Sequence, residues 1–207
     1  MKIDIELIKD LRVRTNAGVL ECKRALEEAL GDIERATELL RERGVAIALK
    51  RATKVANEGV VEAYIHTDKR VGALVEVNCE TDFVAKTEEF RIFVKDICMQ
   101  VAAMEPRYMS RADVPEAVVE REKEILVLRA RKEGKPEEAI DGIVEGRLEN
   151  FYANVCLLDQ AFIKDEKLKI SDILNEKIAK FGEKIVIRRF ARFRVGDETF
   201  DYGEAKV

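Results

Sequence analysis

The spacing of apolar residues predicts three short helices at the start of the chain. Between residues 1 and 44, apolar positions recur every three or four residues in three groups separated by turn residues. Asp32 suits the N-cap of the third helix and Gly44 its C-terminal cap. The three groups are Ile5, Ile8 and Leu11; Val19, Cys22, Ala25, Leu26 and Ala29; and Ile33, Ala36, Leu39 and Leu40. They predict a small three-helix bundle, which we expect either to dock on the rest of the molecule or to serve for contact, because so small a core is marginal alone.

The period of the pattern changes to two after a basic connector near residues 50–54. From residue 59 to residue 67 apolar and polar side chains alternate, with Val61, Ala63 and Ile65 on one side, which is typical of a half-buried strand. A polar turn follows, and the apolar run 71–77 predicts the partner strand of a hairpin.

Helical spacing returns after this hairpin and gives way to a last strand. A long helix has its inner face at Phe90, Ile97 and Val101 and ends at Pro106. Downstream we expect a helical hairpin at about 113–152 with Pro115 at its first helical position, a short strand or packed loop at 155–163, a helix capped by Ser171 and ended by Gly182, and a strand at about 184–195.

These elements predict an α+β fold, because helices stand before and after antiparallel strands. We expect two domains. The first, residues 1–57, is the three-helix module with its basic connector. The second, residues 58–207, is a core of antiparallel strands packed with helices, including the helical hairpin.

An unusual polar-to-apolar change marks the end of the second strand of the hairpin. Asn78 stops the apolar run, small or polar residues follow, and Phe83 and Val84 then stand where a surface loop is normally hydrophilic. We call residues 81–84 the elbow. Either Phe83 is held out as a binding group, or Phe83 and Val84 fold back onto the next helix; spacing alone leaves both open.

Composition narrows the class of protein. The chain has 207 residues, 47% hydrophobic and 38% charged, with a net charge of −4, which disfavours non-specific binding to polyanions. No apolar run approaches the roughly 20 residues that span a bilayer, and no signal peptide is recognisable, so we expect a cytoplasmic protein without membrane contact. Four scattered cysteines and one histidine supply a metal site poorly, and we expect neither metal nor cofactor.

An enzymatic reading finds little support. Cys79 and Asp82 lie close in sequence and His66 is near a neighbouring strand, so a Cys–His nucleophile is conceivable. A half-buried structural cysteine is the favoured interpretation, because no motif fixes the spacing. Glycine-rich phosphate loops are absent from the sequence, so we expect no nucleotide site and no catalysis.

A nucleic-acid reading depends on the last strand. Residues 184–194 contain five basic residues and no acid, interleaved with Phe190 and Phe193, and such a strand can stack bases and pair with phosphates. Half of this alternation is also typical of a core face, and the arginines can pair with acids elsewhere. RNA binding by this strand, rich in arginine and phenylalanine, is kept as the alternative function, with Arg192 and Arg194 as the residues to test.

Several segments resemble the translation elongation factor Ts family. Residues 11–26 (LRVRTNAGVLECKRAL) and 31–36 (GDIERA) are similar to the N-terminal signature of that family, and residues 75–85 (VEVNCETDFVA) to its second signature. Residues 157–162 (LLDQAF) and 189–196 (RFARFRVG) are similar to its closing segments. The resemblance spans the chain in the right order, and it implies the α+β fold with an N-terminal module of the UBA-like type.

The resemblance implies a guanine-nucleotide exchange factor for elongation factor Tu. In this family the factor binds the GDP-bound GTPase and speeds GDP release. By resemblance, Asp82 and Phe83 enter the partner near its nucleotide-associated magnesium site, and Thr81 and Val84 complete that element. Four N-terminal residues would grip the nucleotide domain of the partner: Arg12, Val19, Leu20 and Lys23. Val19 and Leu20 stand where the family commonly has methionines.

The resemblance also implies an assembly. The chain is similar to the short form of the family, with one strand-rich core repeat where longer relatives carry two. We therefore expect two copies to associate as a homodimer, with the core strands or the helical hairpin at the interface, and no direct contact with nucleic acid.

Overall fold

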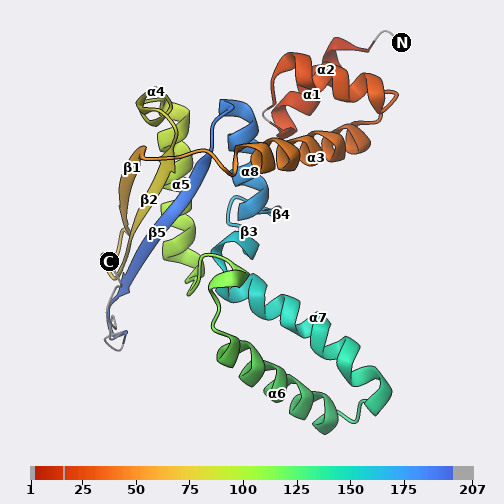
Figure 1. The fold of residues 1–207 in the computed structure, drawn as a ribbon, viewed down its shortest axis with the longest axis vertical. Coiled ribbons are helices and arrows are strands. Elements are labelled where there is room, and N and C mark those ends of the chain that lie inside the picture. Colours follow the sequence, from red (N-terminus) through yellow and green to blue (C-terminus); the bar gives the residue numbers. More distant parts are fainter. Residues whose placement is uncertain (1–2, 16, 198–207) are drawn as a thin grey trace.

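A computed structural model describes residues 3–15 and 17–197 of the chain. Its order of elements is helices, a strand hairpin, more helices and a last strand, which confirms the predicted α+β class (Figure 1). Residues 1–2, Asn16 and residues 198–207 lie outside the described residues, so the start of the first predicted domain and the end of the second are not described. None of the helices in the described ranges combines the length and the hydropathy that crossing a bilayer requires.

Three helices form the N-terminal module: α1 (Ile5–Thr15), α2 (Val19–Glu28) and α3 (Ile33–Arg51). Leu11, Leu26 and Leu39 meet in its buried core. The predicted N-cap is confirmed, since the Asp32 side chain accepts a hydrogen bond from the Arg35 backbone N–H at 3.0 Å. The predicted end at Gly44 is wrong, because α3 continues to Arg51.

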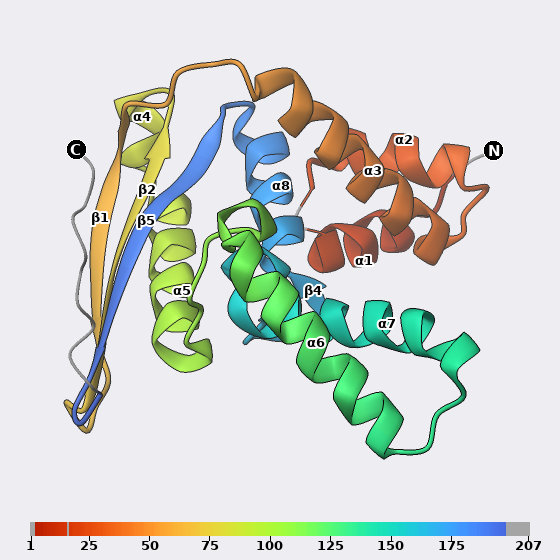
Figure 2. The same cartoon turned by 60° about the horizontal axis from the view of Figure 1, so that its bottom comes forward.

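The missing side chain at Gly44 lets α3 lie close to another helix. Gly44 is buried, and a Cβ at this position would lie 3.6 Å from the backbone oxygen of Asn175 on α8 (Ile170–Phe181). The glycine therefore marks a helix crossing rather than a helix end. This crossing attaches the module to the rest of the molecule, as Figure 2 shows.

A three-stranded antiparallel sheet is the centre of the second part. Its order is β1 (Glu58–Ile65), β2 (Val71–Cys79) and β5 (Ile185–Arg194), with a register shift between Glu76 and Val77 where β2 pairs with β5. Helix α5 (Glu88–Met104) packs across β1 and β2 on one face (Figure 2).

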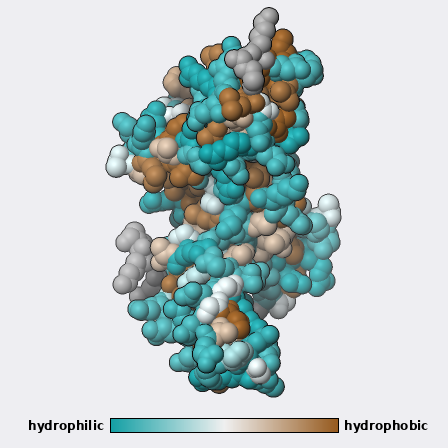
Figure 3. All heavy atoms as spheres, turned by 90° about the vertical axis from the view of Figure 1, so that its right-hand side faces the viewer, coloured by the Kyte–Doolittle hydropathy of each residue, from teal (hydrophilic) through white to brown (hydrophobic). Residues whose placement is uncertain are grey.

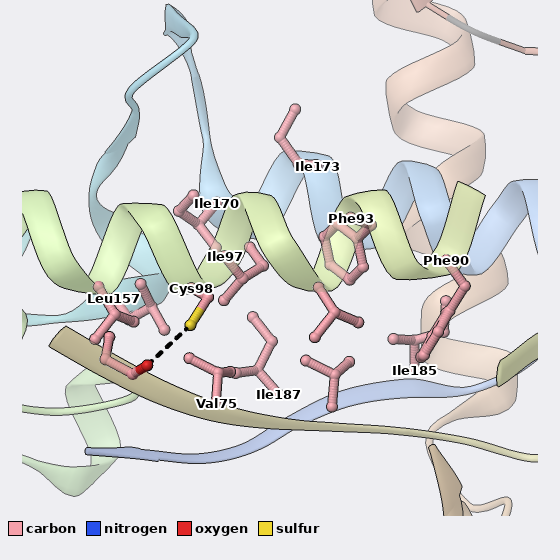
Figure 4. Packing of buried hydrophobic residues seen from close by; sticks show 14 of the residues in the cluster. Val75, Phe90, Phe93, Ile97, Cys98, Leu157, Ile170, Ile173, Ile185 and Ile187 are labelled. Carbon is pink, nitrogen blue, oxygen red and sulfur yellow. Dashed lines mark hydrogen bonds between the residues drawn. The ribbon is translucent and has the colours of Figure 1, made fainter. Parts of the chain in front are cut away.

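The main core lies between this face of the sheet and α5. Val75 and Ile187 from the sheet meet Phe90, Phe93 and Ile97 from α5, and Cys98 donates a hydrogen bond from its Sγ to the backbone oxygen of Ala73 at 3.3 Å (Figure 4). The alternation predicted for β1 is present, but its apolar side is the exposed one. Val60 and Tyr64 pack on the core, whereas the residues at 61, 63 and 65 face solvent.

The predicted helical hairpin projects from the opposite end of the molecule to the module (Figure 1). After the short 3-10 helix η1 (Arg111–Asp113), it consists of α6 (Glu116–Lys132) and α7 (Glu137–Val155). Its own small core contains Leu126, Ala130, Ile140 and Val144. Pro115 is the N-cap of α6 and not its first helical residue.

A compact segment connects the hairpin to the last strand. It contains η2 (Leu157–Asp159), a two-stranded sheet of β3 (Ala161–Phe162) and β4 (Asp165–Lys169), and then α8. The predicted cap at Ser171 is wrong: Lys169 is the N-cap, and its backbone N–H donates to the Asp172 carboxylate at 3.0 Å. Gly182 ends α8 in the left-handed conformation (φ 67°), as predicted.

Candidate functional site

The elbow is a single helical turn at the exit of β2. Thr81 caps the four-residue helix α4 (Asp82–Ala85), and its Oγ1 accepts a hydrogen bond from the Val84 backbone N–H at 3.4 Å. Phe83 is 79% exposed, whereas Val84 packs against the main core. The two apolar residues thus separate: Val84 anchors the turn and Phe83 stands in solvent, so the alternative in which both fold back is wrong.

Asp82 lies beside the exposed ring of Phe83. Its carboxylate accepts a hydrogen bond from the Lys86 ammonium group at 2.5 Å, one turn further on. This hydrogen bond, with the positive charge of Lys86, lowers the pKa of Asp82 below its usual value. The elbow therefore presents an ionised carboxylate next to an exposed aromatic side chain at neutral pH.

The four N-terminal candidates lie on the outer surface of the module. Val19, Leu20 and Lys23 are exposed in the first turns of α2, with Leu20 at 69%, and Arg12 is exposed on α1. Lys23 lies 3.8 Å from Glu27 on the same helix. Figure 3, which faces the module side, shows apolar side chains at the surface among hydrophilic ones over these helices.

The structure does not bring the two candidate sets into contact. Figures 1 and 2 both show α4 and α2 on opposite sides of α8, toward the end of the molecule away from the helical hairpin. They can therefore contact a second protein at two separated places.

The imagined Cys–His nucleophile is not formed. Cys79 is fully buried, and its Sγ donates to the backbone oxygen of Thr81 at 3.1 Å. Burial raises the pKa of this thiol to about 11, which keeps it protonated. His66 lies beyond the other end of the β1–β2 ladder, because Cys79 pairs with Glu58 while Ile65 pairs with Gly72.

The last strand does not form a continuous basic row. The Arg192 side chain is 11% exposed and donates to the backbone oxygen of Ala102 at 3.1 Å, and Arg189 pairs with Glu76 at 2.6 Å. Phe190 packs on the core, while Phe193 faces the other side of the sheet. This arrangement does not support the RNA-binding alternative. Within residues 3–15 and 17–197, no group of three or more histidine, cysteine or acidic side chains is arranged to hold a metal ion.

Comparison with known proteins identifies the family. The model of the family described as elongation factor TS matches residues 13–197. The chain belongs to the elongation factor Ts family. This membership assigns it to the elongation factors of protein biosynthesis and confirms the resemblance seen in the sequence motifs.

Proteins named elongation factor Ts match over nearly the whole chain. That of Caldanaerobacter subterraneus subsp. tengcongensis is 61% identical over 94% of this chain and 98% of its own length. Those of Thermoanaerobacter pseudethanolicus and Carboxydothermus hydrogenoformans are 58% and 57% identical over the same share of this chain, and over 96% and 90% of their own lengths. The elongation factor Ts match contains the whole elbow and most of the N-terminal candidates; Arg12 lies just before it.

Sequence reasoning missed two acidic residues, Glu183 and Glu80, that fix the start of the elbow by hydrogen bonds. The side chains of Glu183 and Glu80 accept hydrogen bonds from backbone N–H groups at the ends of β2 and β5. Acidic residues are frequent in this chain, so nothing in the local pattern distinguishes these two from solvated charges. Only the antiparallel pairing of β2 with β5 brings them to the elbow.

Proposed function

We propose that the protein is a guanine-nucleotide exchange factor for elongation factor Tu, acting in the cytoplasm. The observation that carries this proposal is Phe83, a large apolar side chain 79% exposed on an anchored turn, inside the range that matches the elongation factor Ts family. Ordered turns that present exposed apolar side chains are a common form of protein-binding site.

In this proposal, Asp82 and Phe83 enter the partner near its magnesium and nucleotide site, with Thr81 and Val84 as their support. A factor releases a nucleotide only if it binds the nucleotide-free partner more tightly than the loaded one, and this coupling is reciprocal. The ring of Phe83 supplies contact area in one partner conformation and a steric conflict in the other. A coupling of about 3 kcal/mol corresponds to a roughly 150-fold change in affinity.

The N-terminal module supplies the second contact. Arg12, Val19, Leu20 and Lys23 would bind the nucleotide domain of the partner, with two apolar side chains at the centre and two cations at the rim. The two apolar side chains would add buried contact area to this interface, and charges at its rim would mainly steer association.

We further propose that two copies associate through the open face of the sheet. On the side away from α5, exposed apolar residues come from all three strands, with Val61 and Ile65 on β1, Leu74 on β2 and Phe193, 60% exposed, on β5. A contiguous apolar face of this kind is typical of an interface. The helical hairpin, the other candidate interface, exposes Leu128 and, to a smaller extent, Val118, both on α6.

The decisive experiment is the release of fluorescent GDP from elongation factor Tu, followed by stopped flow. Phe83→Ala is expected to slow stimulated release by about tenfold or more, because it removes an anchor side chain worth about 2 kcal/mol without touching the core. Met104→Ala is the matched control, since it also truncates an exposed apolar residue. Met104 is the last residue of α5, at the end of that helix away from the elbow. Wild-type protein that leaves the release rate unchanged would refute the proposed function.

A further inference from the structure

Two carboxylates tie the end of β2 to the start of β5 behind the elbow. Glu183 Oε2 accepts from the backbone N–H groups of Glu80 and Thr81 at 3.1 and 3.0 Å. In return, Glu80 Oε1 accepts from the backbone N–H of Lys184 at 2.6 Å. These bonds continue the pairing of the two strands past its last partners, Cys79 and Ile185.

Thr81 is the point on which these bonds converge. Its hydroxyl donates to Glu183 Oε1 at 2.6 Å while it caps α4 by accepting from the Val84 N–H. Its backbone oxygen accepts from the Sγ of Cys79 at 3.1 Å. Every polar atom of Thr81 therefore has a partner, and two of its bonds, from the backbone N–H and the hydroxyl, go to the Glu183 carboxylate.

Helix α4 depends on this support. A helix of four residues has too few internal hydrogen bonds to be stable by itself. Its first residue follows Thr81 directly, so the direction in which Phe83 points is set by the orientation of Thr81. Bonds to an ionised carboxylate are stronger than those between neutral groups, and they fix that orientation.

The same pair of strand ends also holds the connector to the N-terminal module. The Lys184 ammonium group donates to the backbone oxygens of Ala52 and Lys54 at 2.6 and 2.8 Å, and Arg51 lies 3.5 Å from Glu80. The elbow and the end of α3 are thus fixed to one small region of the molecule.

We propose that Glu183 is a positioning residue for nucleotide exchange, which holds Thr81 so that α4 presents Phe83 in one fixed direction. The inference rests on the proposed exchange activity and deepens it. Glu183 acts through Thr81 and the orientation of Phe83, and it makes no contact of its own with the nucleotide. A fixed ring loses less conformational freedom when the partner closes around it, so more of its contact energy is available to favour the nucleotide-free state.

The test uses two substitutions of Glu183 in the full chain. Glu183→Ala removes three bonds, two from Thr81 of the elbow and one from the backbone N–H of Glu80. Glu183→Gln keeps the length of the side chain, an oxygen for the two N–H groups and an amide that can donate to the Thr81 hydroxyl. Lys164→Ala is the control, because it removes a charged side chain and the contact of its ammonium group with the Asp96 carboxylate, 2.6 Å away, at the β3–β4 turn.

We expect Glu183→Ala to lower the maximal rate of stimulated GDP release by about tenfold or more, and Glu183→Gln by no more than about threefold. Lys164→Ala leaves the rate unchanged. In a Phe83→Ala background, Glu183→Ala should change the rate by less than about twofold, because residues that act through one another are not additive. A general loss of fold would instead add to the effect of Phe83→Ala, and such additivity would overturn the inference.

Amide hydrogen exchange of the free protein supplies a readout that does not need the partner. In Glu183→Ala the amides of Glu80, Thr81 and Val84 should lose protection, while those of α5 keep it. Unchanged protection at the elbow would overturn the positioning role. If wild-type protein does not speed GDP release, the proposed function fails. If wild-type protein speeds GDP release and the Glu183→Ala variant speeds it equally, only the proposed role of Glu183 fails.

Discussion

Leu30 is held in a backbone conformation that its side chain disfavours. It follows Ala29, the C-cap of α2, and lies in the left-handed region with φ 54°; 78% of the residue is exposed, so no packing compensates for the strain. The adjacent Gly31 N–H donates to the Leu26 oxygen at 2.8 Å, which fixes this turn. The strain therefore lies in the connection between two helices of the N-terminal module.

Leu30→Gly is expected to stabilise the protein by about 1 kcal/mol, because glycine adopts the left-handed conformation without steric cost. Thermal unfolding should show a melting temperature higher by about 2–4 °C. The control is Leu128→Gly, the same substitution at an exposed position inside α6, which should destabilise by about 1 kcal/mol. A change in the free energy of unfolding with the same sign in both variants would contradict this explanation.

Single residues were also where sequence reasoning was weakest. At the elbow, Phe83 and Val84 have the same apolar character, and only the short helix decides that one points outward and the other inward. Glu183 could not be singled out, because its partners lie about one hundred residues earlier in the chain. Hydrogen bonds between distant segments leave no periodic trace in a sequence.

At the scale of elements, Arg111 fixes the base of the helical hairpin. Its guanidinium group donates to Glu149 at 2.7 and 2.8 Å and to Asp159 at 2.8 and 2.6 Å, and it lies 4.8 Å from the centre of the Tyr152 ring. The hydrogen bonds to Glu149 and Asp159 raise the pKa of Arg111 above its ordinary value. One side chain thus connects η1, α7 and η2.

Arg111→Ala is expected to loosen the attachment of the hairpin and lower the free energy of unfolding by only about 1 kcal/mol, since the group is partly exposed. Amide hydrogen exchange near residues 149–155 should become faster, while exchange in α5 is unchanged. Arg111→Lys keeps the charge but loses the two-pronged contacts, so it should be intermediate. Exchange at wild-type rates in Arg111→Ala would show that the hairpin is held by packing alone.

The periodicity of the sequence located most elements and failed at their contacts. It predicted the three N-terminal helices, the strand hairpin and the helical hairpin, because each has an apolar side that repeats. It misplaced Gly44 and Ser171, which have cap-forming chemistry. Gly44 lies at a helix crossing and not at a helix end, and α8 begins earlier than predicted, with Lys169 as its N-cap. Local propensity is a weak guide where tertiary contacts compete.

At the scale of the whole molecule, the open face of the sheet is the feature that the alternating pattern could not explain by itself. Both sides of the sheet carry apolar residues, so a half-buried strand in one chain is consistent with a fully covered strand in a pair of chains. Which side α5 covers follows from the inward positions of β2, where Val75 and Val77 are fully buried.

Phe193→Glu is expected to weaken the proposed homodimer by about tenfold or more, because a carboxylate without a partner is costly to bury between two apolar faces. Sedimentation equilibrium across a range of protein concentrations measures this change. Leu128→Glu on the hairpin is the matched variant. Dissociation by Leu128→Glu, with Phe193→Glu still dimeric, would move the interface to the hairpin.

The four buried cysteines can serve as natural probes of local opening in three regions of the molecule. Cys22 lies in the N-terminal module, Cys79 and Cys98 lie in the core beside the sheet, and Cys156 lies at the base of the hairpin; none is in a disulfide. Burial raises the pKa of each thiol, so a thiol reagent reacts only after the surrounding region has opened and the group has ionised in water. Labelling rates followed by mass spectrometry would therefore rank how readily these three regions open in the unmodified protein, with no engineered probe.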